Sequence, residues 1–161
     1  MNAHTRIALK LVHGESFAEN LARFIRPLLI KGAPSVMTDL KELYFDPAKV
    51  ACIEAQLLKW HASMDEFNTL GGAEDEEEQD PTVILWLKIF VAQHYLFVRD
   101  LDKALVYINQ GIEHTPTHID LYLIKAQILQ KGGDWKRGQE LYEEGRMLDQ
   151  ADRALNALSA K

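Results

Sequence analysis

A 34-residue internal repeat restricts the folds open to this chain more than any other feature of its sequence. When the sequence after residue 81 is shifted by 34 positions, small residues fall on small residues and bulky ones on bulky ones. The matched pairs are Ala92 with Ala126, Ala104 with Gly138, Gly111 with Gly145, Tyr95 with Leu129 and Ile108 with Tyr142. Because one unit of this size cannot bury its own apolar face, neighbouring units must stack to complete a core.

The repeat is typical of helical hairpins of the tetratricopeptide type. Small residues are needed where the two helices of a hairpin cross, and a bulky residue fills the gap between them. Turns are expected at residues 99–101 and 132–133, and Pro116 closes the first unit. We therefore predict an all-α fold of about eight helices, a right-handed superhelix of stacked helical hairpins (a tetratricopeptide-like α-solenoid).

The chain divides into three parts. Residues 1–68 are expected to form a degenerate repeat region of three helices, the longest of which begins at Asp46 and Pro47. Residues 69–81 are expected to form an acidic flexible loop, because residues 74–80 carry six acidic side chains and no basic one. Such a run is typical of a solvated loop and less often of an interaction tail. Residues 82–161 hold two repeats and the start of a third near Arg153, so we expect an internal piece of a longer protein.

The composition excludes several classes of partner. The net charge of −6 is concentrated in the acidic run, and the rest of the chain is balanced, which argues against DNA or another nucleic acid as the main partner. No apolar run reaches the roughly 18 residues that a membrane span needs. The single cysteine, Cys52, is expected to be a reduced core thiol, so we predict a cytoplasmic protein.

No catalytic, metal-binding or coenzyme-binding motif is present in the sequence. His114 and His118 are four residues apart, but Pro116 separates them, and no cysteine or carboxylate cluster accompanies them. An acetyltransferase would need a glycine-rich loop between a strand and a helix, and neither is found. A chaperone adaptor that clamps a carboxylate would need lysine and asparagine where Ile89 and Gln93 stand. We therefore predict a binding scaffold and not an enzyme.

Two sets of residues are candidates for binding. The first helix of each repeat lines the concave face of such a solenoid, which selects Lys88, Gln93, Tyr122 and Gln127 as partner-binding residues. Tyr122 could instead pack between repeats. Basic residues on adjacent helices, Lys125, Lys131, Arg153 and Lys161, either converge into an anion pocket or are separate solvated cations. The apolar ends of the stack also predict self-association.

Several short stretches resemble the auxiliary subunit of the N-terminal acetyltransferase A complex. They include residues 32–36 (GAPSV), 49–54 (KVACIE), 92–95 (AQHY), 104–109 (ALVYIN) and 148–153 (LDQADR). The similarity runs colinearly through nearly the whole chain. Gln93-His94 and Ala151-Asp152-Arg153 are the most specific parts, because the repeat itself does not require them.

The resemblance implies a non-catalytic role. Such subunits form long solenoids that wrap the catalytic acetyltransferase subunit and anchor it at the ribosome, where nascent chains are acetylated. The family also implies that inositol hexakisphosphate binds between the subunits, at basic positions that correspond to Lys125, Arg153 and Lys161. Gln127 and Leu158 stand at two further positions that are basic in the family. The alternative is a generic tetratricopeptide interaction module without a carboxylate clamp.

Overall fold

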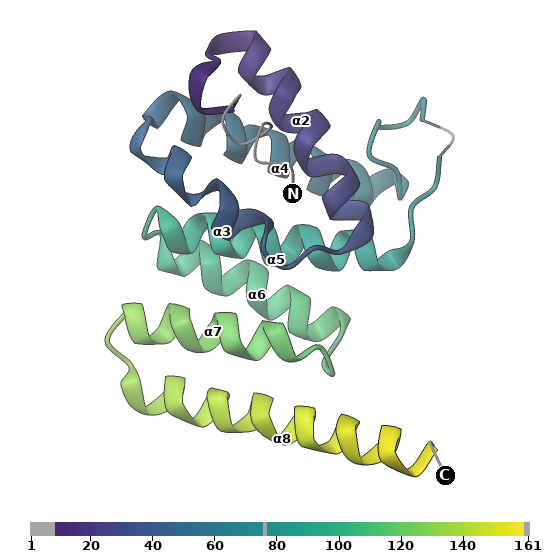
Figure 1. Cartoon of the computed structure of the whole chain (residues 1–161), viewed down its shortest axis with the longest axis vertical. Helices are drawn as coiled ribbons and strands as arrows, with labels where there is room; N and C mark the ends of the chain where they lie inside the picture. The colour runs from purple at the N-terminus through teal and green to yellow at the C-terminus, as the bar shows by residue number, and fades with distance from the viewer. Residues whose placement is uncertain (1–8, 76, 160–161) are drawn as a thin grey trace.

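The computed structural model describes residues 9–75 and 77–159, and these are almost entirely helical. The elements are α2 (Gly14–Lys31), α3 (Val36–Leu40), the 3-10 helix η1 (Lys41–Phe45), α4 (Pro47–Phe67), α5 (Pro81–Phe97), α6 (Leu101–His114), α7 (Ile119–Lys131) and α8 (Trp135–Ser159). The described residues include no strand. The prediction of an all-α solenoid with about eight helices is confirmed (Figure 1).

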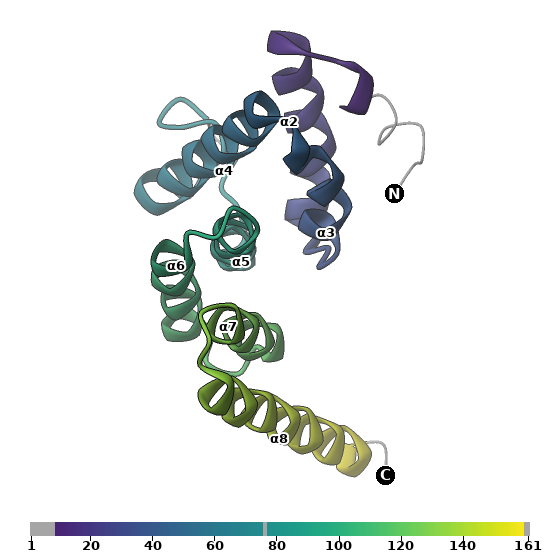
Figure 2. The same cartoon turned by 90° about the vertical axis from the view of Figure 1, so that its left-hand side faces the viewer.

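The helices follow one another in an open arc. Helices α5 to α8 stack as two antiparallel hairpins, and α2, α3 and α4 cover the other end of the stack (Figure 1). Viewed from the side, α5 and α7 lie toward the inside of the arc and α4 and α6 toward its outside (Figure 2). The short helix α3 lies beside α5 on the inner side, so the open side of the arc has three helical walls.

Small residues allow the helices of the repeats to approach closely. Ala92, Ala104 and Ala126 are fully buried. A Cβ added to Gly111 would lie 2.7 Å from the Leu121 side chain, and one added to Gly138 would lie 3.2 Å from the Ala126 carbonyl oxygen. A larger residue at these crossings would push the helices apart and change the curvature of the arc.

A glycine at the end of α2 packs against α5 with no room for a side chain. Gly32 has a φ of 76°, in the left-handed region, and its N–H donates to the last carbonyls of α2. A Cβ at this position would lie 2.5 Å from Nε1 of Trp86 on α5. Only glycine therefore satisfies both the turn and the approach of the indole ring.

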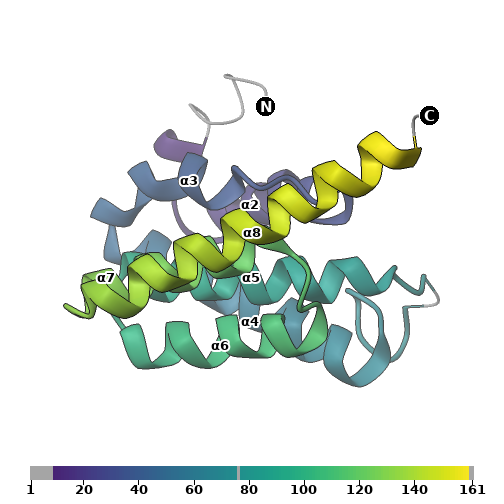
Figure 3. The ribbon, with the colours of Figure 1, turned by 90° about the horizontal axis from the view of Figure 1, so that it is seen from below.

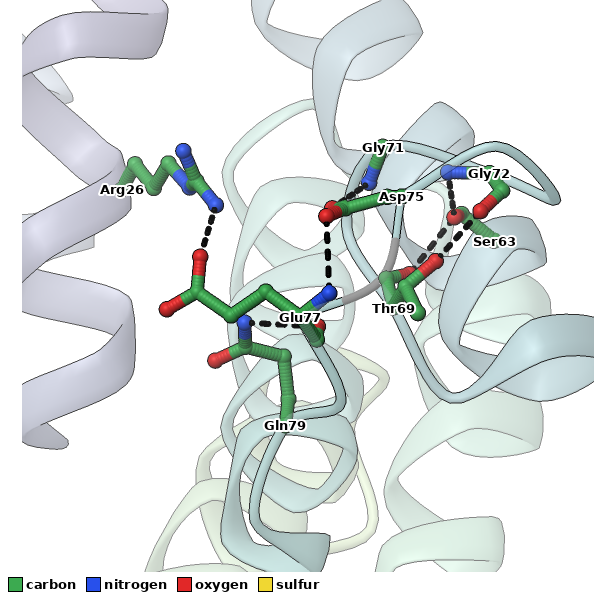
Figure 4. A network of polar contacts seen from close by, with 8 residues as sticks. All are labelled: Arg26, Ser63, Thr69, Gly71, Gly72, Asp75, Glu77 and Gln79. Atoms are coloured by element: carbon green, nitrogen blue, oxygen red, sulfur yellow. Dashed lines mark hydrogen bonds and ion pairs between the residues drawn. The ribbon is translucent and has the colours of Figure 1, made fainter.

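The loop between α4 and α5 contains several hydrogen bonds to its backbone, although most of its described residues are exposed; its flexibility stays a prediction. Ser63 Oγ donates to the Thr69 carbonyl and accepts the Gly72 N–H, at 2.6 and 2.9 Å. The Asp75 carboxylate accepts the N–H groups of Gly71 and Glu77, at 2.8 and 3.1 Å (Figure 4). Charge composition alone cannot reveal these bonds, because they depend on how the backbone turns.

Helix α8 is continuous where the sequence predicted a new repeat near Arg153 (Figure 3). The reason is local, since Gln150 stands where Pro116 ended the preceding unit, and no glycine or proline follows it. The second half of α8 exposes the apolar residues Met147, Leu155 and Leu158. Self-association through such surfaces stays a prediction.

Replacing Gly32 by alanine tests the contact between α2 and α5. The left-handed backbone costs an alanine about 1–2 kcal/mol, and the collision with Trp86 adds about 1–3 kcal/mol. We expect urea unfolding to show a free energy of unfolding lower by about 2–5 kcal/mol. Gly14→Ala is the matched control, because Gly14 also has a positive φ but has open space around it. Equal losses in the two variants would contradict the role given to Trp86.

Candidate functional site

A groove runs along the inner face of the arc between α3, α5 and α7. Its central hollow has a volume of about 340 Å³. The floor comes from residues spaced by three or four positions, Ile89, Gln93 and Leu96 on α5 and Asp120, Leu123, Ile124 and Gln127 on α7. The same spacing places these side chains on one face of each helix. Thr38 and Lys41 form the facing wall.

The groove continues beyond the central hollow at both ends. Toward the α5–α6 turn, a hollow of about 420 Å³ shares Lys41 and Gln127 with the centre and adds Arg99 and Lys131. Toward the start of α7, a hollow of about 570 Å³ shares Asp120 with the centre. The three hollows are therefore neighbours, joined at their edges by shared lining residues.

The two ends of the groove carry opposite charges. Lys41, Arg99 and Lys131 line one end, and the carboxylates of Asp120, Asp149 and Asp152 line the other. At the acidic end, the His118 imidazole, whose Nε2 lies 3.5 Å from the Asp120 carboxylate, lowers the pKa of the Asp120 carboxyl below its usual value. A partner with the opposite charge pattern would bind in one preferred direction.

Gln93 leaves an unused hydrogen-bond acceptor in the groove. Its Oε1 atom is buried and has no donor among the described residues. Buried polar atoms in folded proteins almost always have a partner, and an unpaired one costs about 1–3 kcal/mol. A donor from a bound partner would satisfy this atom.

A buried polar contact holds the α3–η1 wall against α5. The Tyr44 hydroxyl and His94 Nδ1 form a hydrogen bond of 2.6 Å. His94 is 1% exposed, and Glu54 on α4 lies 3.9 Å from its Nε2. Burial lowers the pKa of His94, and Glu54 opposes this only in part. The imidazole is therefore neutral at pH 7 and serves as a structural tie.

Lys88 does not line the groove, and its role as a partner-binding residue stays a prediction. The side chain is buried on the far side of α5, and its Nζ lies 3.1 Å from His61 Nε2 and donates to Gln110 Oε1 at 3.2 Å. Burial lowers the pKa of this ammonium. Helix α5 is covered on most of its circumference, so its polar residues do not all face the open side.

The other predicted partner-binding residues are divided between two places. Gln93 and Gln127 both line the central hollow. Tyr122 faces the neighbouring helix α8, where its Cβ lies 3.6 Å from the position of a Cβ on Gly145. Its hydroxyl donates to the Pro116 carbonyl at 2.6 Å. Tyr122 therefore packs between helices, as the alternative interpretation held.

The predicted anion-binding residues are not brought together in the described residues. Burial lowers the pKa of Lys125, and Arg137 lowers it further, whereas Glu144 raises it. Arg153 pairs with Asp149 at 3.1 Å and lies about 14 Å along α8 from Glu144. Lys161 lies outside the described residues. No contact joins Lys125 to Arg153 among the described residues, so a shared anion site stays a prediction.

Sequence reasoning missed the α3 side of the groove. Thr38 on α3 and Lys41 on η1 precede the repeats. The 34-residue pattern does not predict where α3 and η1 pack. Trp86 could have been found, because it lies three residues before Ile89 on the helix that lines the concave face.

The described residues contain neither a metal-binding cluster nor a helix that could span a membrane. No three histidine, cysteine or acidic side chains lie close enough together to hold a metal ion. None of the described helices is both long and apolar enough to cross a membrane.

Comparison with known proteins points to one family. The model of the family "N-terminal acetyltransferase A, auxiliary subunit" matches residues 1–161. The human protein N-alpha-acetyltransferase 16, NatA auxiliary subunit, is 37% identical over 97% of this chain and 18% of its own length. The Arabidopsis thaliana N-terminal acetyltransferase A complex auxiliary subunit NAA15 is 38% identical over 99% of this chain, also 18% of its own length. The chain therefore spans less than a fifth of these relatives.

A solved structure has the same fold. A chain in the structure of Naa15/Naa10 bound to HypK-THB superposes with a TM-score of 0.80 at 27% sequence identity. The match covers 99% of this chain and 23% of that one.

Lowering the pH should weaken the fold through His94. The unfolded chain takes up a proton near pH 6.5, whereas the buried imidazole resists protonation. The unfolded state then binds more protons, so the free energy of unfolding falls as the pH drops from 7 toward 5. Urea unfolding at several pH values should show a shallower dependence for His94→Gln. His114→Gln, which changes an exposed ring, is the control and should keep the original slope. An unchanged slope in His94→Gln would contradict this assignment.

Proposed function

The chain belongs to the family of auxiliary subunits of N-terminal acetyltransferase A, and we propose that it is a non-catalytic scaffold segment whose groove binds the catalytic subunit. The observation that carries the proposal is the groove on the inner face, whose floor mixes apolar and polar side chains and whose ends carry opposite charges. The related solved structure contains Naa15 together with Naa10, which supports a role in assembly.

The lining of the groove suits an amphipathic segment of a protein. Leu96, Ile124 and Leu123 offer apolar contact, and Gln93 and Gln127 offer hydrogen bonds between them. An amphipathic helix places apolar anchors at a three- and four-residue spacing, which matches the spacing of the floor. In this proposal the groove recognises and positions, and acetyl transfer takes place in the partner.

The cellular role follows from the family. We propose that the full-length protein acts in the cytoplasm and positions the catalytic subunit at the ribosome for acetylation of nascent chains. Inositol hexakisphosphate stays a predicted ligand of the full complex. Because Lys125 and Arg153 are apart in this chain, each would contribute one contact to a site that the partner subunit completes.

Two groove variants test the proposal. Lys131→Glu reverses a charge at the basic end, and Leu123→Arg places a cation on the apolar floor. We expect the dissociation constant for the purified catalytic subunit, measured by isothermal titration calorimetry, to rise about threefold to tenfold for Lys131→Glu and at least about tenfold for Leu123→Arg.

The matched control is Lys136→Glu, which makes the same charge change on α8 at an exposed position outside the groove. It should bind as the parent chain does. Absence of binding by the parent chain, or an equal loss in the control, would contradict the groove as the binding surface.

A further inference from the structure

A second cleft lies between α2, α4 and the loop at residues 68–80. It has a volume of about 340 Å³ and shares no lining residue with the groove. Its walls carry three cations, Arg23 and Arg26 from α2 and Lys59 from α4, together with Trp60 and Leu70. One carboxylate, that of Asp75, also lines it. The cleft therefore has a cationic wall with an apolar patch.

The cations of this cleft are not used to hold the fold together. Arg23 and Lys59 are exposed and form no ion pair with any described residue. Arg26 Nη2 pairs with Glu77 Oε2 at 3.3 Å, and its Nε atom is buried without an acceptor. Three cations on two helices thus share the cleft with two carboxylates of the loop, Asp75 and Glu77, and of these two only Glu77 forms an ion pair with one of the cations.

The carboxylate that pairs with Arg26 is that of Glu77, in the acidic loop. Asp75 accepts the Glu77 N–H and so fixes the backbone that carries Glu77 toward Arg26 (Figure 4). The Gln79 side chain donates to the Glu77 carbonyl from the other side. Both partners of the Arg26–Glu77 pair remain substantially exposed, at 43% and 68%. An exposed pair of this kind is worth at most about 1 kcal/mol, so another carboxylate can displace Glu77.

We propose that this cleft binds an acidic peptide segment, and that Glu77 occupies the Arg26 position as an intramolecular competitor. A peptide fits better than a compact phosphate, because its carboxylates are spaced along a chain and can reach cations on two helices. Its apolar side chains can contact Trp60 and Leu70.

A labelled peptide tests the cleft directly. The probe is a fluorescein-labelled peptide that copies residues 72–80, titrated with the 161-residue chain and followed by anisotropy. We expect Glu77→Gln to bind it about twofold to fivefold more tightly than the parent chain, because the competing carboxylate is gone. Glu74→Gln removes a charge from the same loop at an exposed position that contacts no cation among the described residues, and should bind as the parent does.

Removing one of the cations should weaken binding of the labelled peptide. Arg26→Gln should weaken it at least tenfold. Lys59→Gln provides an independent test if Arg26→Gln is poorly folded by circular dichroism. A control peptide with glutamine and asparagine in place of the acidic residues should not bind. Equal affinities of Glu77→Gln and Glu74→Gln, undiminished binding by Lys59→Gln, or displacement of the peptide by millimolar inorganic phosphate would each overturn the proposal.

Discussion

The close approach of helices at small residues is the constraint on which the groove depends. Ala92, Ala104 and Ala126 are fully buried at helix crossings, and Gly111 and Gly138 have no room for a Cβ without a shift in their neighbours. These contacts set the angle between the axes of neighbouring helices. Added along the stack, the angles bend it into an arc. The inner faces of α5 and α7 then line a concave surface. A repeat with larger residues at these positions would have a different curvature, and the floor of the groove would lose its alignment.

The groove also requires that α3 be held beside α5, because Thr38 and Lys41 form the wall that faces the floor. Hydrogen bonding between Tyr44 and His94 supplies this tie across the η1–α5 contact, and the fit of Gly32 against Trp86 supplies another. Both ties use α5 as the common support. Trp86 also contacts His118 edge to face at the start of α7, so one indole ring connects the first helices, the first hairpin and the second. Assembly of a partner on this surface therefore needs little reorganisation of the scaffold.

The sequence predicted those parts of the fold that repeat, and it failed where the pattern breaks. The 34-residue period identified the helical hairpins and placed Gln93 and Gln127 on the groove. It could not place Lys41, because the preceding helices follow no such period. Lys88 lies outside the groove because α5 has neighbours on several sides, which bury eleven of its residues, and helix periodicity alone does not show which side faces the open arc. The acidic run was interpreted by charge alone, although Ser63 and Asp75 bond to the loop's backbone. The absence of a proline at Gln150 explains why α8 continues.

The most direct test of the groove is methyl NMR of the chain on addition of the catalytic subunit. Signals of Ile89, Leu96 and Leu123 report on the inner face, and Val106 on α6, which is 53% exposed, reports on the outer face. Binding in the groove predicts that the three inner methyl signals shift or broaden while that of Val106 stays in place. Perturbation of Val106 with unchanged inner signals would contradict the account and place the interface on the outside of the arc.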